Sequence, residues 1–277
     1  MIWLIVIGGG ALIAFALDFY GLGHPDRQRK VDVADRVPTL FVPGEFGTRY
    51  TFGHMLRRLP VDKQVVALVR QNGSVHLRGR LAFGPHVAVQ VLFADKRVQP
   101  AAQLIGVKRV IAALQQQAPF AAINLVSHSM GGITTVLYTV SRPAVPVRAL
   151  VTLAAPYNDT ALATPGKVVN WPLGPAGPSQ TTPVYEFFRA HVADLPETLQ
   201  WLNVAGDLFN GSQHDGAVGI NSALSIRYLA QDHVARYAEV VIRGPRAAHS
   251  LLHENRLVDA DVATFLWPLQ LKALVVR

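Results

Sequence analysis

The sequence of 277 residues contains no cysteine. Disulfide bonds, thiolate metal sites and a thiol nucleophile are therefore excluded. Internal repeats and low-complexity tracts are missing as well. With half of its residues hydrophobic, the chain is long enough to bury a substantial core, and one large α/β domain is a better prediction than two small ones.

Acidic residues are also scarce, with 18 Asp and Glu against 26 Lys and Arg, which leaves a net charge of +8. Such a charge favours attraction to anionic surfaces such as phospholipid headgroups, wall polymers or nucleic acid. No run of Lys and Arg alternates with aromatic residues, so we interpret the charge as a basic, solvated surface and expect no nucleic-acid partner. We expect neither a metal nor a cofactor.

The segment 2–17 lacks charged residues altogether, and we interpret residues 1–20 as a membrane anchor. As a helix, residues 2–17 would span about 24 Å of a hydrocarbon core that is about 30 Å thick. A cleaved signal peptide is the alternative, with residues 14–16 as the cleavage site, although no Lys or Arg precedes the apolar run. Arg27, Arg29 and Lys30 follow it and would favour a cytoplasmic location of that flank. A buried N-terminal helix is the third possibility.

Residues 21–37 are polar and show no apolar periodicity, which predicts a linker, so the folded domain should comprise residues 38–277. Short apolar runs at 39–42, 64–69, 75–80, 87–93, 121–126, 147–154, 199–204 and 237–242 predict strands. The spacing of apolar residues predicts helices after residue 48 and over 101–114, 133–140 and 257–266. A helix or loop is expected over 218–228. This alternation predicts a mainly parallel sheet with helices on both faces.

Proline and glycine interrupt residues 158–182, which argues against regular structure there. Together with a short helix at 185–192, this stretch predicts a small cap over the active site, spanning about residues 158–198. Trp171, Leu173, Phe187 and Phe188 would give the cap an apolar lining suited to an acyl or aryl group. A disordered surface loop is the alternative.

Ser129 is the candidate nucleophile, in the sequence SHSMGG at residues 127–132. An apolar strand that ends in a small-residue turn around a central Ser and continues as a helix is the context of a nucleophile elbow. The usual pattern begins with Gly, and here that position is Ser127. A serine between small residues can also belong to an ordinary turn.

A serine hydroxyl needs a general base, and the base needs an anion that holds one tautomer. His249 lies in the predicted loop after the last strand, and Asp215 lies in the loop after the preceding strand. Both loops should open at the carboxyl edge of the sheet together with Ser129. Asp207 competes with Asp215 for the acid, because it follows its strand directly. The order Ser, Asp, His is that of α/β hydrolases.

Four stretches carry a family resemblance: PTLFVPG at 38–44, SHSMGG at 127–132, DGAV at 215–218 with SA at 222–223, and HSLLHEN at 249–255. They resemble the bacterial α/β hydrolases of unknown function that are described as cell-surface hydrolases. The resemblance implies the α/β-hydrolase fold, with Ser129 as nucleophile, Asp215 as acid and His249 as base. It further implies that the backbone N–H groups of Met130 and Glu45 form the oxyanion hole. The chain departs from the family at Pro43, where His is common.

These observations predict a serine hydrolase that cleaves small-molecule or lipid carboxylic esters through an acyl-enzyme intermediate. We expect it to be associated with a membrane through residues 1–20 and to lie outside the cytoplasm, or to be secreted if the segment is cleaved. The alternative is a catalytically silent binding or scaffold protein of the cell envelope that keeps the fold. Esterase, lipase and acyltransferase activities are not separated by the sequence, and the oligomeric state is not indicated.

Overall fold

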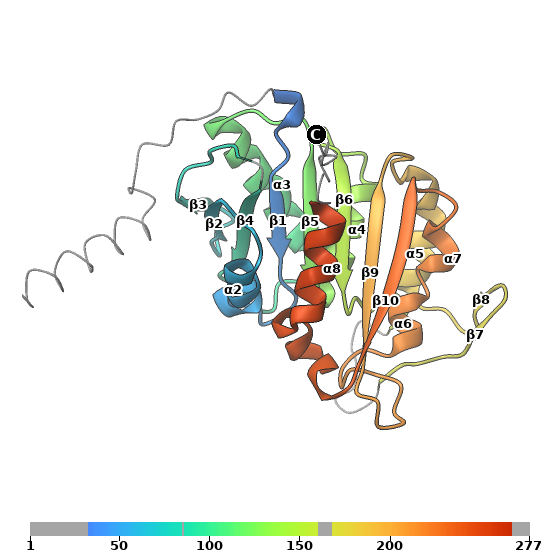
Figure 1. Cartoon of the computed structure of the whole chain (residues 1–277). Coiled ribbons are helices and arrows are strands. Elements are labelled where there is room, and N and C mark those ends of the chain that lie inside the picture. Colours follow the sequence, from blue (N-terminus) through green and yellow to red (C-terminus); the bar gives the residue numbers. More distant parts are fainter. Residues whose placement is uncertain (1–32, 85, 160–167, 268–277) are drawn as a thin grey trace, which may run out of the picture.

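The computed structural model describes residues 33–84, 86–159 and 168–267. Within these residues a mainly parallel sheet runs through the centre of the molecule (Figure 1). Its strands are β1 (Thr39–Val42), β2 (Lys63–Val69), β3 (Val75–Arg78), β4 (Val87–Phe93), β5 (Ile123–His128), β6 (Val147–Leu153), β9 (Gln200–Asp207) and β10 (Arg236–Arg243). They lie in the order β10-β9-β6-β5-β1-β4-β2-β3, and only β2 and β3 pair in antiparallel fashion.

The central strands are buried on both faces, which explains why they are nearly continuous apolar runs in the sequence. Successive residues alternate between two cores. Leu40 packs in the core on one face, and Phe41 packs in the core on the other. Because each face is apolar, each must be covered by helices.

Helices cover both faces, as the sequence predicts (Figure 1). The helices are α2 (Arg49–Arg58), α3 (Pro100–Gln117), α4 (Met130–Val140), α5 (Pro183–His191), α6 (Ile220–Leu224), α7 (Arg227–Ala230) and α8 (Arg256–Leu266). Helices α2 and α8 lie in front of the sheet in Figure 1, where Phe52 and Val262 join the core around Phe41. Helices α3, α4 and α5 pack on the opposite face, in the core around Leu40.

Local signals in the sequence set the starts of several helices. The Thr48 hydroxyl accepts a hydrogen bond from the Tyr50 N–H (3.2 Å), and the Thr48 N–H donates to Thr51 Oγ1 (3.1 Å), which caps α2. Pro100 occupies the first turn of α3. The Asn255 side chain accepts from the Leu257 N–H (3.0 Å) at the start of α8.

Val33–Asp35, within the predicted linker, forms the 3-10 helix η1. One other expectation needs correction. The Pro/Gly-rich stretch contains a two-stranded hairpin of β7 (Leu173–Gly174) and β8 (Gly177–Pro178), where irregular structure alone was expected. Within the hairpin Gly177 has a φ of 124°, a conformation that favours glycine.

The predicted anchor at residues 1–20, and most of the predicted linker, lie outside the described residues. Among the residues that the structure describes, no helix combines the length and the apolar character required to cross a membrane.

Candidate active site

Ser129 lies at the sharp turn between β5 and α4, at the carboxyl edge of the sheet. Its φ of 56° and ψ of −132° are unfavourable for a residue with a side chain, so the surroundings must hold this conformation. The Ser129 N–H donates to the carbonyl oxygen of Leu153 (2.8 Å), and the Ser129 carbonyl accepts from the N–H of Gly132 (2.8 Å). Ser129 thus occupies the strained strand-turn-helix position that the sequence predicts for a nucleophile.

The glycines after Ser129 are required by close packing. A Cβ on Gly131 would lie 2.6 Å from the Val42 carbonyl oxygen, and a Cβ on Gly132 would lie 2.4 Å from the Ala155 Cβ. These two glycines lie inside α4, which begins at Met130 and therefore earlier than its apolar pattern predicts. Helix α4 can approach the sheet this closely only because neither residue has a side chain.

Ser127 replaces the usual first glycine of the motif without disturbing the turn. Its side chain is buried, and its hydroxyl lies 2.9 Å from Thr135 Oγ1 and 3.3 Å from the Val151 carbonyl oxygen. These partners belong to α4 and β6, so the hydroxyl links the three elements that meet behind Ser129. A small polar side chain therefore fits where glycine is common.

The structure brings Ser129, His249 and Asp215 into one hydrogen-bonded chain. His249 Nε2 lies 2.9 Å from Ser129 Oγ, and His249 Nδ1 lies 2.8 Å from Asp215 Oδ2. A carboxylate accepts hydrogen bonds, so the proton of a neutral His249 is placed on Nδ1, and Nε2 is left to accept from the serine hydroxyl. The arrangement can remove a proton from Ser129 and stabilise the resulting imidazolium.

The Asp215 carboxylate is held by its own loop and is 1% exposed. Its Oδ1 accepts from the N–H groups of Ala217 (2.9 Å) and Val218 (2.7 Å), which leaves Oδ2 for His249. Gly216, with a φ of 102°, makes the turn that brings these two N–H groups round. Burial and three hydrogen bonds therefore fix the carboxylate in one orientation.

Asp207, the competing acid, does not face His249. It is the last residue of β9, which extends beyond its predicted end at 204. Its Oδ1 accepts from the Phe209 N–H (2.9 Å), and its Oδ2 lies 3.7 Å from Arg243 Nε. Its carboxylate therefore accepts a hydrogen bond within the turn after β9 and pairs with Arg243 of the neighbouring strand β10.

The two predicted oxyanion donors lie on segments that pack against each other. Met130 is the first residue of α4, so its N–H has no acceptor within the helix. Glu45 lies in the turn between β1 and α2, next to Gly44. A Cβ on Gly44 would lie 3.2 Å from the Met130 nitrogen, which places the two backbones side by side. Pro43 contributes its carbonyl oxygen, which accepts from Gln103 Nε2 (3.3 Å), so its missing N–H is of no consequence here.

The predicted apolar lining of the cap is wrong for Phe188. That side chain is 2% exposed and contacts the ring of Tyr157 (centroids 6.0 Å apart), so it belongs to the core. Phe187 is 42% exposed and stacks on His191. Helical spacing alone did not show that α5 turns one of its two adjacent phenylalanines into the core. Trp171 and Leu173 are half-buried.

The described part of the excursion returns to the loop that carries Asp215. The Asn158 side chain closes the excursion by donating to Gln180 O (2.8 Å) and accepting from the Thr182 N–H (2.9 Å). Asn170 Oδ1 accepts from the N–H of Asn221 (2.8 Å), at the start of α6. Residues 160–167 of the predicted cap lie outside the described residues.

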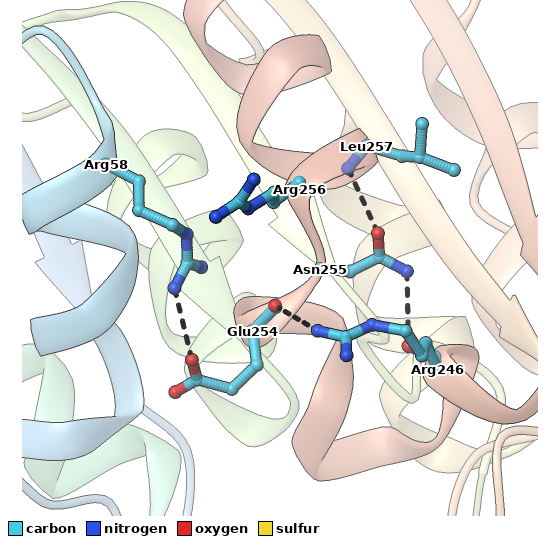
Figure 2. Close-up of a pocket in the computed structure, with 6 residues that line it drawn as sticks. All are labelled: Arg58, Arg246, Glu254, Asn255, Arg256 and Leu257. Atoms are coloured by element: carbon cyan, nitrogen blue, oxygen red, sulfur yellow. Dashed lines mark hydrogen bonds and ion pairs between the residues drawn. The ribbon is translucent and has the colours of Figure 1, made fainter.

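A basic cavity of about 500 Å³ lies where α2 ends and α8 begins (Figure 2). It is lined by Arg58, Arg246, Glu254, Asn255, Arg256 and Leu257. Arg58 Nη1 contacts Glu254 Oε2 (3.3 Å), and Arg246 Nη2 donates to the Glu254 carbonyl oxygen (3.0 Å). None of Ser129, His249 and Asp215 lines it, so this cavity is separate from the candidate site. In the described residues, no cluster of His, Asp and Glu has the geometry to hold a metal ion.

Comparisons with known proteins identify the family and the fold of the chain. The family model described as "Alpha/beta hydrolase of unknown function (DUF915)" matches residues 26–268. None of the curated proteins compared with the sequence matches it.

Solved structures show the same fold. The product of the gene lin2722 from Listeria innocua is 22% identical, with a TM-score of 0.76 over 86% of this chain and 96% of that one. A "putative cell surface hydrolase" from Lactobacillus plantarum is 22% identical, with a TM-score of 0.67 over 85% of this chain and 92% of that one. Since the family model covers most of the sequence, the chain belongs to the family of alpha/beta hydrolases of unknown function.

Proposed function

We propose that this chain is a serine hydrolase that cleaves carboxylic esters through an acyl-enzyme intermediate. One observation carries the proposal: a serine at a strained elbow lies 2.9 Å from a histidine whose other nitrogen lies 2.8 Å from a buried aspartate. A serine with a structural role alone would need neither the unfavourable backbone conformation nor this aligned base.

In the proposed reaction, His249 Nε2 takes the proton of Ser129 Oγ as that oxygen attacks the ester carbonyl. Asp215 stabilises the imidazolium that forms. The carbonyl oxygen becomes negatively charged, and the N–H groups of Met130 and Glu45 are the proposed donors to it. His249 then protonates the departing alcohol, which leaves an acyl group on Ser129. A water molecule, activated by the same histidine, releases the acid.

The proposed substrate class is a small-molecule or lipid ester. Phe46 and Phe209 are strongly exposed on the loops that follow β1 and β9, at the same edge of the sheet as Ser129. Exposed aromatic side chains at this edge suit an apolar acyl or aryl group. Phe188 does not contribute, because it is buried in the core.

Labelling with a fluorophosphonate probe tests the proposal, since this probe reacts with an activated serine. We expect covalent labelling of the intact protein and none of Ser129→Ala, with equal thermal unfolding temperatures for both. A panel of p-nitrophenyl esters of increasing chain length then defines the acyl preference. If Ser129→Ala is labelled and turns over esters as the unaltered protein does, Ser129 is not the nucleophile and the proposal is wrong. If the unaltered protein is neither labelled nor active on any ester, the silent binding protein becomes the better hypothesis.

We also propose that residues 1–20 attach the protein to a membrane and that the domain lies outside the cytoplasm. The support is the uncharged apolar run 2–17 and its separation from the domain by a polar stretch. A protein that starts near Arg27 should be soluble and active in labelling. Failure of this shorter chain to fold would show that the N-terminal segment belongs to the core. A mature chain that starts near Leu17 would favour a cleaved signal instead.

A further inference from the structure

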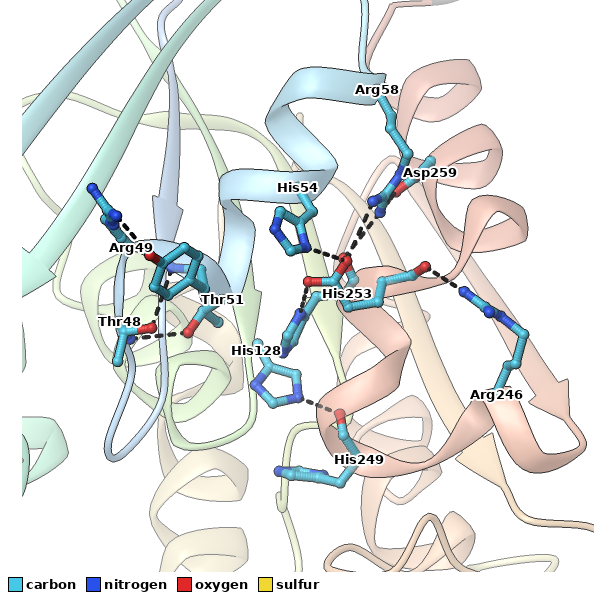
Figure 3. A network of polar contacts seen from close by, with 12 residues as sticks. Thr48, Arg49, Thr51, His54, Arg58, His128, Arg246, His249, His253 and Asp259 are labelled. Carbon is cyan, nitrogen blue, oxygen red and sulfur yellow. Dashed lines mark hydrogen bonds and ion pairs between the residues drawn. The ribbon is translucent and has the colours of Figure 1, made fainter.

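His128, directly before Ser129, contacts the backbone of the histidine that faces that serine (Figure 3). Its Nε2 lies 2.9 Å from the carbonyl oxygen of His249. A carbonyl oxygen only accepts hydrogen bonds, so His128 must carry its proton on Nε2 and donate it. This role could not be predicted from the sequence, because a histidine inside the motif looks like any other side chain between the small residues.

With this contact, both the N–H and the carbonyl group of His249 are hydrogen-bonded. The His249 N–H donates to the carbonyl oxygen of Asp215 (2.8 Å), and its own carbonyl accepts from His128. His249 is the first residue of the 3-10 helix η4 (His249–Glu254), and Ala248 before it has an extended ψ of 144°. With the backbone fixed on both sides, the imidazole is directed between Asp215 Oδ2 and Ser129 Oγ.

The environment of His128 keeps its ring uncharged. The residue is 6% exposed, and burial lowers its pKa well below the ordinary value of 6.5, with the neighbouring His249 and His253 lowering it further. The rings of His128 and His249 lie 4.6 Å apart. A cation at that distance would oppose the imidazolium that His249 forms during the proposed reaction. A neutral donor holds the backbone without this penalty.

The rest of the polar network in Figure 3 has a different task. His253 meets the edge of His128 (centroids 5.0 Å apart), and Glu254 contacts His54 Nδ1 (3.0 Å) and Arg58. These residues connect η4 to α2 and make no hydrogen bond to His249 among the described contacts. His253 provides a matched control, because it packs against His128 and lacks the contact with the His249 carbonyl.

We propose that His128 is a positioning residue whose Nε2–H holds the His249 carbonyl and so sets the imidazole against Ser129. This inference rests on the proposed function of Ser129 and His249. His128 touches neither Ser129 Oγ nor the aspartate in the described contacts, so its effect would be on alignment. A displacement of about 1 Å at a reacting group is enough to lower a rate by about 100-fold.

Two amide variants separate the donor from mere packing. His128→Gln places an amide N–H at about the reach of Nε2, whereas His128→Asn keeps an amide of the same polarity that is one methylene too short. We expect His128→Asn to lower kcat for p-nitrophenyl acetate by about 10- to 100-fold, with KM changed by less than about twofold. His128→Gln should recover most of kcat. His253→Leu, a loss of a similarly buried histidine, should reduce stability and leave kcat nearly unchanged.

Equal losses of kcat in His128→Asn and His128→Gln, or no loss in either, would overturn the proposal. Long-range ¹H–¹⁵N spectra of the histidine side chains give a second readout that does not need activity. The unaltered protein should show His128 as the Nε2–H tautomer, and His128→Asn should shift the ring signals of His249. If the unaltered protein neither hydrolyses esters nor reacts with the fluorophosphonate, the proposed function fails. The spectra then still decide whether His128 holds His249: unchanged His249 signals in His128→Asn would refute it.

Discussion

Gly44 and Ser129 are in such close contact that a Cβ on Gly44 would lie 2.9 Å from the Cβ of Ser129 and 2.9 Å from the carbonyl oxygen of His128. Neither obstacle is the flexible end of a side chain, so neither can move aside cheaply. The loop after β1 therefore packs directly on the elbow. Glu45 can keep its position relative to Ser129 only because residue 44 has no side chain.

Gly44→Ala should separate this loop from the elbow and displace the proposed oxyanion donor at Glu45. Because removing one such donor costs about 100- to 1,000-fold, we expect kcat to fall by at least about tenfold. Gly53→Ala is the control: Gly53 lies in α2 with nothing within 4 Å of its Cβ position, so this change should leave kcat intact and stabilise the protein by about 0.5–1 kcal/mol. Kinetics with p-nitrophenyl esters and urea unfolding measure both. An unaltered kcat in Gly44→Ala would contradict the proposed role of this loop.

Asp215→Asn should lower kcat by up to about 10⁴-fold, because an amide cannot hold the required tautomer of His249 or stabilise its cation. Asp207→Asn should have a small effect, since the Asp207 carboxylate is used by Phe209 and Arg243. Measuring kcat for the two variants side by side distinguishes the acids. A collapse of the Asp207 variant alone would reverse the assignment.

Asp259→Ala should lower the free energy of unfolding by about 2 kcal/mol, because Asp259 receives two hydrogen bonds from the Arg58 guanidinium that join α2 to α8. The hydrogen bond to Asp259 also raises the pKa of Arg58, so the guanidinium stays charged throughout the useful pH range. Asp194→Ala is the matched control, because its partner Arg142 is 76% exposed. Loss of that surface pair should cost less than about 0.5 kcal/mol in the same urea titration. Equal losses of unfolding free energy in the two variants would show that the Arg58–Asp259 pair contributes no more than a surface pair.

The stability of the protein should fall as the pH drops below about 6.5. Burial lowers the pKa values of His128 and His253 in the folded state, so on acidification the unfolded chain binds protons that the folded chain does not. Between its folded and unfolded pKa values, each such histidine lowers the free energy of unfolding by up to about 1.4 kcal/mol for every pH unit of acidification. Above about pH 7 it has no effect. In urea titrations at pH 5, 6 and 7, the free energy of unfolding of His128→Gln should depend less steeply on pH than that of the unaltered protein. Identical slopes would mean that His128 is protonated in the folded state.

The sequence was sufficient to predict the strands of the central sheet, because apolar runs bounded by Gly and Pro have few alternatives in a long α/β chain. It also predicted the elbow, since Ser129 lies among residues small enough for the turn. The preference for Asp215 over Asp207 came from family resemblance. Physical reasoning alone could not distinguish the two acids. The path of the loop after β9 depends on the φ of Gly216 and on backbone N–H groups that reach the Asp215 carboxylate only in the folded loop.

Other features depend on contacts that no local pattern reveals. Gly131 and Gly132 disfavour a helix by propensity, and α4 includes them because packing against β1 and Ala155 outweighs that cost. Phe187 and Phe188 are neighbours in sequence, yet only Phe188 enters the core. His128 was missed because its partner is a backbone carbonyl 121 residues further along the chain.

The order of the strands has a consequence for how the protein gains its activity. Strands β5, β6, β9 and β10 are added outward from the centre of the sheet in the order of synthesis, and Ser129 belongs to the first connection among them. Asp215 and His249 arrive only with the turns after β9 and β10. A nascent chain released before β10 therefore carries Ser129 without its proposed base, and the regain of the proposed ester hydrolysis during refolding should report the docking of the last edge strand.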